Sequence, residues 1–370
     1  LFRSTTNKFK TGEAAQLRLA FEEVTGKDMH WFWNQWYYGS GHPKLKINYN
    51  YEEAGKAWVI VEQTQKSGKV FNMPIAIDVY QNGQRQRYDV WLSNKIDSFS
   101  FPVSGKPELI NVDADKYLLC EKTDNKSEEN FIAQWKYARN YLDRKEALDA
   151  FAKKNMPELA NGLRDKFFKL RISTIQKLAT SPYKNDKVVV GDIEEMASKD
   201  RNTLVRAAAI NFLVKNGDAR FKPIYEKSVT DSSYSVAGAA LKGLIALDSV
   251  NAYKYAKQFS NDAKGALGEA VNEVLFTQGT ESDYEALMKA YEDAPPSEAK
   301  LSTTEKFAAY LSRINNTANI KAGIDAMMRF YNMIPAQYKN YVQQSFQSGF
   351  DKISQAKGKE MEDYIKSVFK

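Results

Sequence analysis

The sequence predicts a multidomain protein with a short helical N-terminal segment, an all-β sandwich of about seven strands and an all-α superhelix. Three observations predict it. Aromatic residues crowd one short helical stretch, apolar residues then recur at every second position, and the remaining chain is helical with an internal repeat. We expect the parts to be residues 1–41, 42–122 and 131–370, with 123–130 as a polar linker.

The N-terminal part is predicted to hold two helices, over residues 14–24 and 28–38. The second collects aromatic side chains at Trp31, Phe32, Trp33, Trp36, Tyr37 and Tyr38. A packed aromatic ring buries about 150–250 Å², so we expect these rings to hold the helix against a larger body, with ligand stacking as the alternative. A stub of this size cannot build its own core. We therefore expect the chain, which begins without Met, to have been cut from a longer one.

Between residues 43 and 121 the apolar residues alternate with polar ones, which is typical of half-buried strands. The pair Asn82-Gly83 indicates a two-residue hairpin, because both positions tolerate positive φ. The spacing of seven short strands in this region indicates a β-sandwich. The strands are expected near residues 45–49, 58–61, 74–80, 88–92, 99–101, 108–112 and 117–120.

The helical part contains a pattern that recurs at an offset of 31 residues, starting at Asp200, Asp231 and Asp262. Each Asp is followed five residues later by a branched apolar residue, then by a small residue and a Leu. Small residues let helices approach closely, and the repeated apolar face is buried by the next repeat. The pattern resembles HEAT-type helix pairs. Residues 131–180 and 300–370 are helical without a clear repeat, and Pro295-Pro296 interrupts the array.

The composition excludes several classes of protein. The chain has 370 residues, of which 43% are hydrophobic and 27% charged, as in ordinary globular proteins. No apolar run is long enough for a membrane span. The net charge of +7 is dispersed, so we expect no nucleic-acid partner. One cysteine, Cys120, allows no intramolecular disulfide and is expected in the core. Both an exported or periplasmic bacterial location and a cytoplasmic one stay open.

Residues for catalysis are scarce. The chain has two histidines, His30 and His42, and neither lies in a zinc-binding pattern. No Gly-x-Ser-x-Gly elbow accompanies them, and Gly265-Ala266-Leu267-Gly268 lies inside a predicted repeat helix rather than in a phosphate-binding loop. We therefore predict no catalytic, cofactor-binding or metal-binding residue in this chain.

The segment from Trp36 to Pro43 leads from the aromatic helix into a strand, and it resembles the exit from the catalytic domain of aminopeptidase N-like (gluzincin) zinc metallopeptidases. Residues 72–77 and 109–113 resemble strands of the sandwich that follows that domain. In the family, a helical domain of HEAT-like pairs comes next, so the resemblance covers the whole chain in domain order. In the helical part the resemblance concerns the order and type of elements, and no sequence motif supports it.

The resemblance implies that the parent protein binds zinc and hydrolyses N-terminal residues from peptides. The family's His-Glu-x-x-His and Gly-x-Met-Glu-Asn motifs and its catalytic Tyr do not occur here, so no catalytic residue is carried over. It also implies two partners, an upstream catalytic domain and the peptide substrate. The helical domain would cap the active-site cleft and limit substrate access, with a Lys or Arg meeting a substrate carboxylate. The alternative is a catalytically inactive HEAT-type scaffold that binds a peptide or protein.

Overall fold

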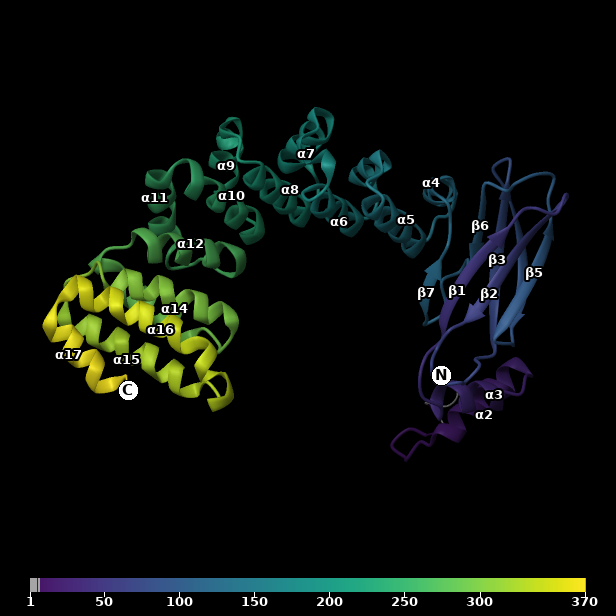
Figure 1. The fold of residues 1–370 in the computed structure, drawn as a ribbon, viewed down its shortest axis with the longest axis horizontal. Helices are drawn as coiled ribbons and strands as arrows, with labels where there is room; N and C mark the ends of the chain where they lie inside the picture. Colours follow the sequence, from purple (N-terminus) through teal and green to yellow (C-terminus); the bar gives the residue numbers. More distant parts are fainter. Residues whose placement is uncertain (1–4, 6, 370) are drawn as a thin grey trace. The chain divides into compact units, whose positions relative to one another are not determined.

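The computed structural model describes residue 5 and residues 7–369. The chain forms two compact units, Leu1–Glu158 and Leu159–Lys370 (Figure 1). The first holds the N-terminal helices, all seven strands and one helix pair, and the second is helical. The predicted fold class of helical segment, two-sheet β region and all-helical remainder is thereby confirmed. No helix in the described ranges is both long and apolar enough to cross a membrane.

Two helices open the first unit, as the sequence predicts. Helix α2 (Ala14–Thr25) ends at Gly26, whose φ of 67° places it in the left-handed region that glycine adopts without strain. Helix α3 (His30–Phe32) starts where the Asp28 carboxylate accepts the amide of His30 at 2.8 Å. It continues as one π-helical turn (Trp33–Tyr37) rather than as the longer α-helix that the sequence predicts.

The seven strands form two sheets, ordered β5-β2-β1-β7 and β4-β3-β6. All neighbours are antiparallel except β1 and β7. The predicted hairpin at Asn82-Gly83 is confirmed, since both residues have positive φ (52° and 72°) and they join β3 to β4. The strands are β1 (Lys44–Asn50), β2 (Lys56–Gln63), β3 (Met73–Gln81), β4 (Gln84–Leu92), β5 (Ile96–Pro102), β6 (Leu109–Val112) and β7 (Glu121–Asp124).

The core of the sandwich lies between the inner faces of the two sheets. Alternate residues of β2 are buried, which follows from the alternation of side chains along a strand. They meet buried residues of β1, β3 and β6 in one continuous cluster, to which Trp36 of the N-terminal segment is added. The cluster includes Leu45, Ile47, Val59, Val61, Phe71, Met73, Ile77, Val79, Leu92 and Val112.

The seventh strand lies four residues later than predicted. Residues 117–120 form no strand, although Leu118 and Cys120 pack on the core. Tyr117 and Leu119 are instead 85% and 82% exposed. The free edge of β1 is taken by β7 in parallel pairing. Its end is held where Asp124 accepts hydrogen bonds from Tyr49 and from a buried lysine, each at 2.7 Å.

Residues 123–130, predicted as a polar linker, contain the end of β7 and the start of α4. Ser127 and Asn130 form a capping box there. Helices α4 (Glu128–Tyr137) and α5 (Tyr141–Lys153) belong to the first compact unit. Tyr137 stacks on Tyr80 of the sheet, and Asp143 lies 2.7 Å from Lys116. The predicted boundaries at residues 41, 122 and 130 divide the chain more finely than the two compact units do, and they stay a prediction.

The second unit consists of helices joined by short turns. The turns include 3₁₀ segments at Pro157–Arg164 (which spans the boundary between the units), Pro182–Asn185, Ala219–Phe221 and Glu281–Asp283. The helices are α6 (Phe168–Leu178), α7 (Lys187–Lys199), α8 (Thr203–Asn216), α9 (Lys222–Ser228), α10 (Tyr234–Leu247), α11 (Ser249–Phe259), α12 (Gly265–Gln278), α13 (Tyr284–Asp293), α14 (Glu298–Leu311), α15 (Thr317–Met333), α16 (Ala336–Lys357) and α17 (Lys359–Val368).

The 31-residue pattern has a structural counterpart. Helices α8, α10 and α12 have 14 residues each and begin at residues 203, 234 and 265, which are 31 apart. They pack in series, α8 on α10 and α10 on α12. At Gly238 the approach is so close that a Cβ would lie 2.5 Å from the carbonyl carbon of Ala266. Packing therefore requires a small residue at Gly238, whereas the third copy of the pattern has Glu269 at the corresponding position.

Candidate functional site

The two histidines take part in surface ion pairs of the first unit. His42 Nε2 lies 2.7 Å from Glu121 Oε1, and Lys44 Nζ lies 2.8 Å from the other oxygen of the same carboxylate. These contacts lower the pKa of Glu121, with the Lys44 hydrogen bond as the main cause. Because His42 and Lys44 flank the start of β1, while Glu121 begins β7, the cluster ties the parallel strands together.

His30 belongs to the one group of three potential metal ligands found among the described residues, with Glu22 and Asp28. Its Nδ1 lies 2.8 Å from Asp28 Oδ1 and 3.8 Å from Glu22 Oε1. The guanidinium of Arg18 occupies the same place, with Nη1 2.6 Å from Glu22 and 3.2 Å from His30 Nδ1. A metal ion there would meet a fixed positive charge, so these residues do not fit zinc. The cluster instead joins α2 to α3.

The N-terminal helices have two different sides. On one side Trp31 packs edge-on against Trp91 at 5.4 Å, and Trp36 contacts Phe71 at 5.2 Å. Gln35 adds two hydrogen bonds to the backbone of Asn72, of 2.9 and 2.7 Å. The aromatic helix is thus held against the sandwich.

The other side of these helices exposes apolar and aromatic side chains. No residue of α2 is buried, and Val24 is 82% exposed. We call this side the stub face; its exposed residues are Leu19, Phe21, Val24, Phe32, Tyr37 and Tyr38.

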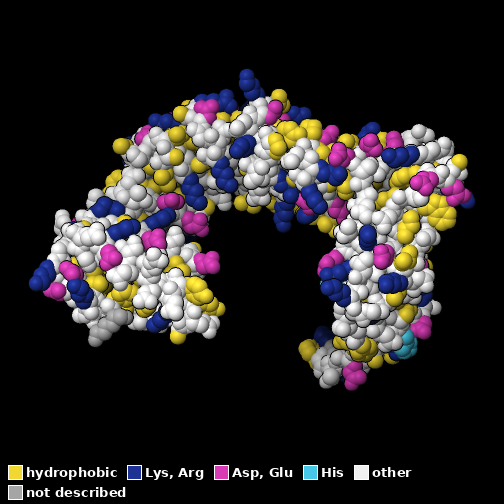
Figure 2. Space-filling view, in the orientation of Figure 1, with side chains coloured by type: hydrophobic (Ala, Val, Ile, Leu, Met, Phe, Trp, Pro, Cys, Tyr) yellow, Lys and Arg dark blue, Asp and Glu magenta, His cyan; other side chains and the backbone are white. Residues whose placement is uncertain are grey.

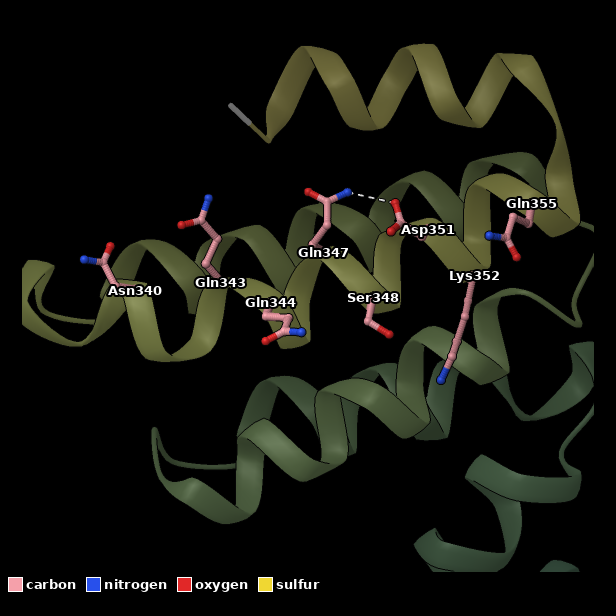
Figure 3. A pocket seen from close by; sticks show the side chains of 8 residues that line it. All are labelled: Asn340, Gln343, Gln344, Gln347, Ser348, Asp351, Lys352 and Gln355. Atoms are coloured by element: carbon pink, nitrogen blue, oxygen red, sulfur yellow. Dashed lines mark hydrogen bonds between the residues drawn. The ribbon is translucent and has the colours of Figure 1, made fainter.

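A shallow recess of about 700 Å³ follows one face of α16 (Figure 3). All eight residues that line it come from this helix. Their spacing of three and four residues places them on one side, while Val342, Phe346, Phe350 and Ile353 are buried on the other. We call this surface the amide face; it consists of Asn340, Gln343, Gln344, Gln347, Ser348, Asp351, Lys352 and Gln355.

The chemistry of the amide face is suited to binding and not to bond cleavage. Five of its eight side chains are carboxamides, which both donate and accept hydrogen bonds as peptide groups do. One internal hydrogen bond, from Gln347 Nε2 to Asp351 Oδ1 at 2.8 Å, is drawn in Figure 3. No nucleophile paired with a base is present. This surface was not among the predicted sites, although amides recurring at three- and four-residue spacing indicate it.

Charged side chains of both signs are mixed over the visible face of each unit (Figure 2). Lysine, arginine, aspartate and glutamate side chains all appear on that face. Binding to a phosphate backbone needs clustered positive charge.

No protein-family model and no curated protein sequence matches this chain. Among solved structures, an engineered protein aligns with a TM-score of 0.33 at 14% identity, over 54% of this chain and 97% of its own. The aminopeptidase A of Legionella pneumophila, in complex with aspartic acid, aligns with a TM-score of 0.52 at 12% identity. That alignment covers 94% of this chain and 53% of the aminopeptidase. The chain is therefore similar in fold to about half of that aminopeptidase.

Proposed function

We propose that this chain is the non-catalytic C-terminal region of a zinc-dependent aminopeptidase that removes N-terminal residues from peptides. One observation carries the proposal: the fold similarity to an aminopeptidase over 94% of this chain, which spans 53% of that protein. Zinc and the residues that activate water would belong to the remaining part of the enzyme. The Glu22, Asp28 and His30 cluster does not fit the metal, because Arg18 occupies it.

The stub face would dock on the catalytic domain of the same polypeptide. Val24 and Tyr38 are 82% and 65% exposed, while Trp31 and Trp36 fix the helical segment to the sandwich. Burying apolar surface contributes about 25 cal/mol per Å². The docked catalytic domain would thereby be connected to the sandwich through one short helical segment.

The helical unit would cap the active-site cleft and limit which peptides enter. The amide face of α16 supports this role, because carboxamides can bind a peptide backbone whatever its side chains. The amide face carries one acidic and one basic side chain, Asp351 and Lys352, so it would bind peptides of either charge.

The test uses the full-length protein that contains this chain and compares a long peptide with a single-residue chromogenic substrate. The double variant Gln343→Ala/Gln347→Ala should raise KM for the peptide several-fold and leave the small substrate unchanged. Gln258→Ala, which removes an exposed amide from α11, is the matched control. Equal effects on both substrates, or a full-length protein without a His-Glu-x-x-His motif, would contradict the proposal.

The second candidate is a catalytically inactive scaffold that binds peptides or proteins. The amide face favours it, since that surface offers binding groups without a nucleophile. The same full-length protein distinguishes the two. Saturable peptide binding without hydrolysis would support the scaffold, and release of N-terminal residues would support the enzyme.

A further inference from the structure

A second recess, of about 470 Å³, lies in the first unit and has no role in the function proposed above. Its lining comes from β3, β4 and β6 on one side and from the α4–α5 pair on the other. Because Ile77 and Val79 point into the sandwich core, their neighbours Asp78 and Tyr80 point to the outer face of the sheet, where this recess lies.

The floor of the recess is a row of paired polar groups. The strand register sets Asp78 between Arg87 and Asn111. Arg87 binds Asp78 with two hydrogen bonds, of 2.8 and 3.0 Å, and it binds Asp115 at 2.9 Å. Bidentate pairing of this kind fixes the guanidinium plane.

The second floor carboxylate, that of Asp143, is paired as well. It lies 2.7 Å from Lys116 Nζ and accepts Asn111 Nδ2 at 3.0 Å. The side chains of Asp78 and Asp143 are 3% and 1% exposed. The floor carboxylates are therefore already neutralised from within the unit, and they offer little to an added cation.

The rim differs from the floor because its cations are exposed, although Lys136 Nζ lies 4.8 Å from the centre of the Tyr137 ring. Arg85, Lys136 and Arg139 are exposed and line the same recess. Arg85 approaches Asp78 no closer than 3.6 Å, and neither Lys136 nor Arg139 forms an ion pair in the described part of the chain. Glu108 is the one further acidic group here, and it is engaged by the Gly83 amide at 2.9 Å and the Tyr137 hydroxyl at 3.4 Å.

The charge balance of the recess is positive. Four cationic groups, Arg85, Arg87, Lys136 and Arg139, line the recess with three carboxylates, those of Asp78, Asp115 and Asp143, and all three carboxylates are in ion pairs. The stacked rings of Tyr80 and Tyr137, 5.7 Å apart, form an aromatic wall beside them. Arginine presents a planar fork of donors that matches carboxylate and phosphate oxygens.

We propose that this recess binds a small oxyanion, through a carboxylate or phosphate group held by Arg85, Lys136 and Arg139. The ligand would bridge β4 and the α4–α5 connection. It would therefore stabilise the first unit against unfolding in proportion to its occupancy.

The experiment is a calorimetric titration of the 370-residue chain at pH 7 and low ionic strength, with inorganic phosphate and citrate as separate probes. We expect one saturable site. The ion that binds with the higher affinity shows whether the site prefers a phosphate or a carboxylate group. Arg85→Gln and Arg139→Gln should each weaken binding about tenfold, because each removes a charge-assisted hydrogen bond to the oxyanion. Arg139→Lys, which keeps the charge but loses the fork, should weaken it less.

Arg201→Gln is the matched control, since Arg201 is an exposed arginine of the second unit that forms no ion pair with any described residue. Its affinity for either probe should equal that of the parent chain. The proposal would be overturned if neither phosphate nor citrate binds saturably. The same holds if a glutamate-rich peptide binds and both small ions do not. An equal loss of affinity in Arg201→Gln would also overturn it, because that loss would indicate unspecific charge screening.

Discussion

Arg171 in α6 binds Asp200, the residue that ends α7, through two hydrogen bonds of 2.8 Å. Both side chains are 8% exposed, and Arg171 also donates to the carbonyl of Asp165 at 2.8 Å. Arg206 repeats the arrangement one step along the array, with Nη2 2.9 Å from Asp231. Ala237 stands 31 residues after Arg206, and among the described residues Asp262 has no ion pair of this kind.

Replacing Asp200 should destabilise the second unit strongly. Asp200→Ala leaves the Arg171 guanidinium buried without its partner, which costs about 3–5 kcal/mol. Urea unfolding of the chain, followed by circular dichroism, measures the loss. Glu195→Ala is the control, because the Lys199–Glu195 pair is exposed at 74% and 63% and should contribute less than about 1 kcal/mol. Similar losses in both variants would contradict the assignment of Arg171–Asp200 as a structural link.

Adding one methyl group at Gly238 should separate α10 from α12. A Cβ there meets the backbone of Ala266 at 2.5 Å and of Leu267 at 2.7 Å, and the backbone cannot yield as a flexible side chain does. We expect Gly238→Ala to cost about 3 kcal/mol.

Gly191→Ala provides the matched control for this prediction. Gly191 lies in α7, and a Cβ there has no neighbour within 4 Å. Because alanine restricts the unfolded chain, this variant should stabilise by about 0.5–1 kcal/mol. The midpoints of urea unfolding should move in opposite directions, and a harmless Gly238→Ala would show that the helices are not in close contact.

The N-cap of α11 should make stability depend on pH in the acid range. Its side chain, Asp248, is bound by Lys222 at 2.8 Å and by Asn251, and these hydrogen bonds lower its pKa to about 2. A depressed folded-state pKa contributes stability above the usual value of 3.8, and that contribution is lost as the pH falls through about 2.

Asp248→Asn tests this expectation. The difference in urea midpoint between the parent chain and Asp248→Asn should be present at pH 5 and should shrink between pH 4 and pH 2. Asp262→Asn, which breaks no recorded ion pair, is the control. A difference that stays constant down to pH 2 would show that the carboxylate is not held by Lys222.

The chain alone should bind no stoichiometric zinc and should release no amino acids from peptides. Arg18 occupies the place between Glu22 and His30, and no other group of three potential ligands lies among the described residues. Elemental analysis after incubation with zinc and desalting, together with a peptidase assay, measures both properties. One zinc per chain that His30→Ala removes would reverse the assignment.

Local sequence signals predicted several elements with good accuracy. Asn82-Gly83 places the β3–β4 turn because its positive φ values depend on those two residues alone. The offset between Asp200 and Asp231 equals the offset between the starts of α8 and α10. The seventh strand was misplaced, because the apolar run at residues 117–120 does not reveal which strand edge is available.

The amide face and the second recess could not be predicted in the same way. The recess brings Asp78 and Asp143 together from parts of the chain 65 residues apart, and helix packing on the outer sheet face decides that they meet. Similarly, Tyr49 and Asp124 become neighbours when β7 pairs with β1.

The sequence by itself determined the order of the helical segment, sandwich and helical array, the hairpin and the 31-residue period. These features depend on the spacing of apolar residues and on turn residues, which act over a few positions of the chain. The tertiary structure alone decided that β7 joins β1 in parallel and that α4 and α5 complete the first unit. It also decided which cations of the second recess stay unpaired. Such outcomes depend on contacts between distant residues, where the geometry of packing selects one partner among many with the right chemistry.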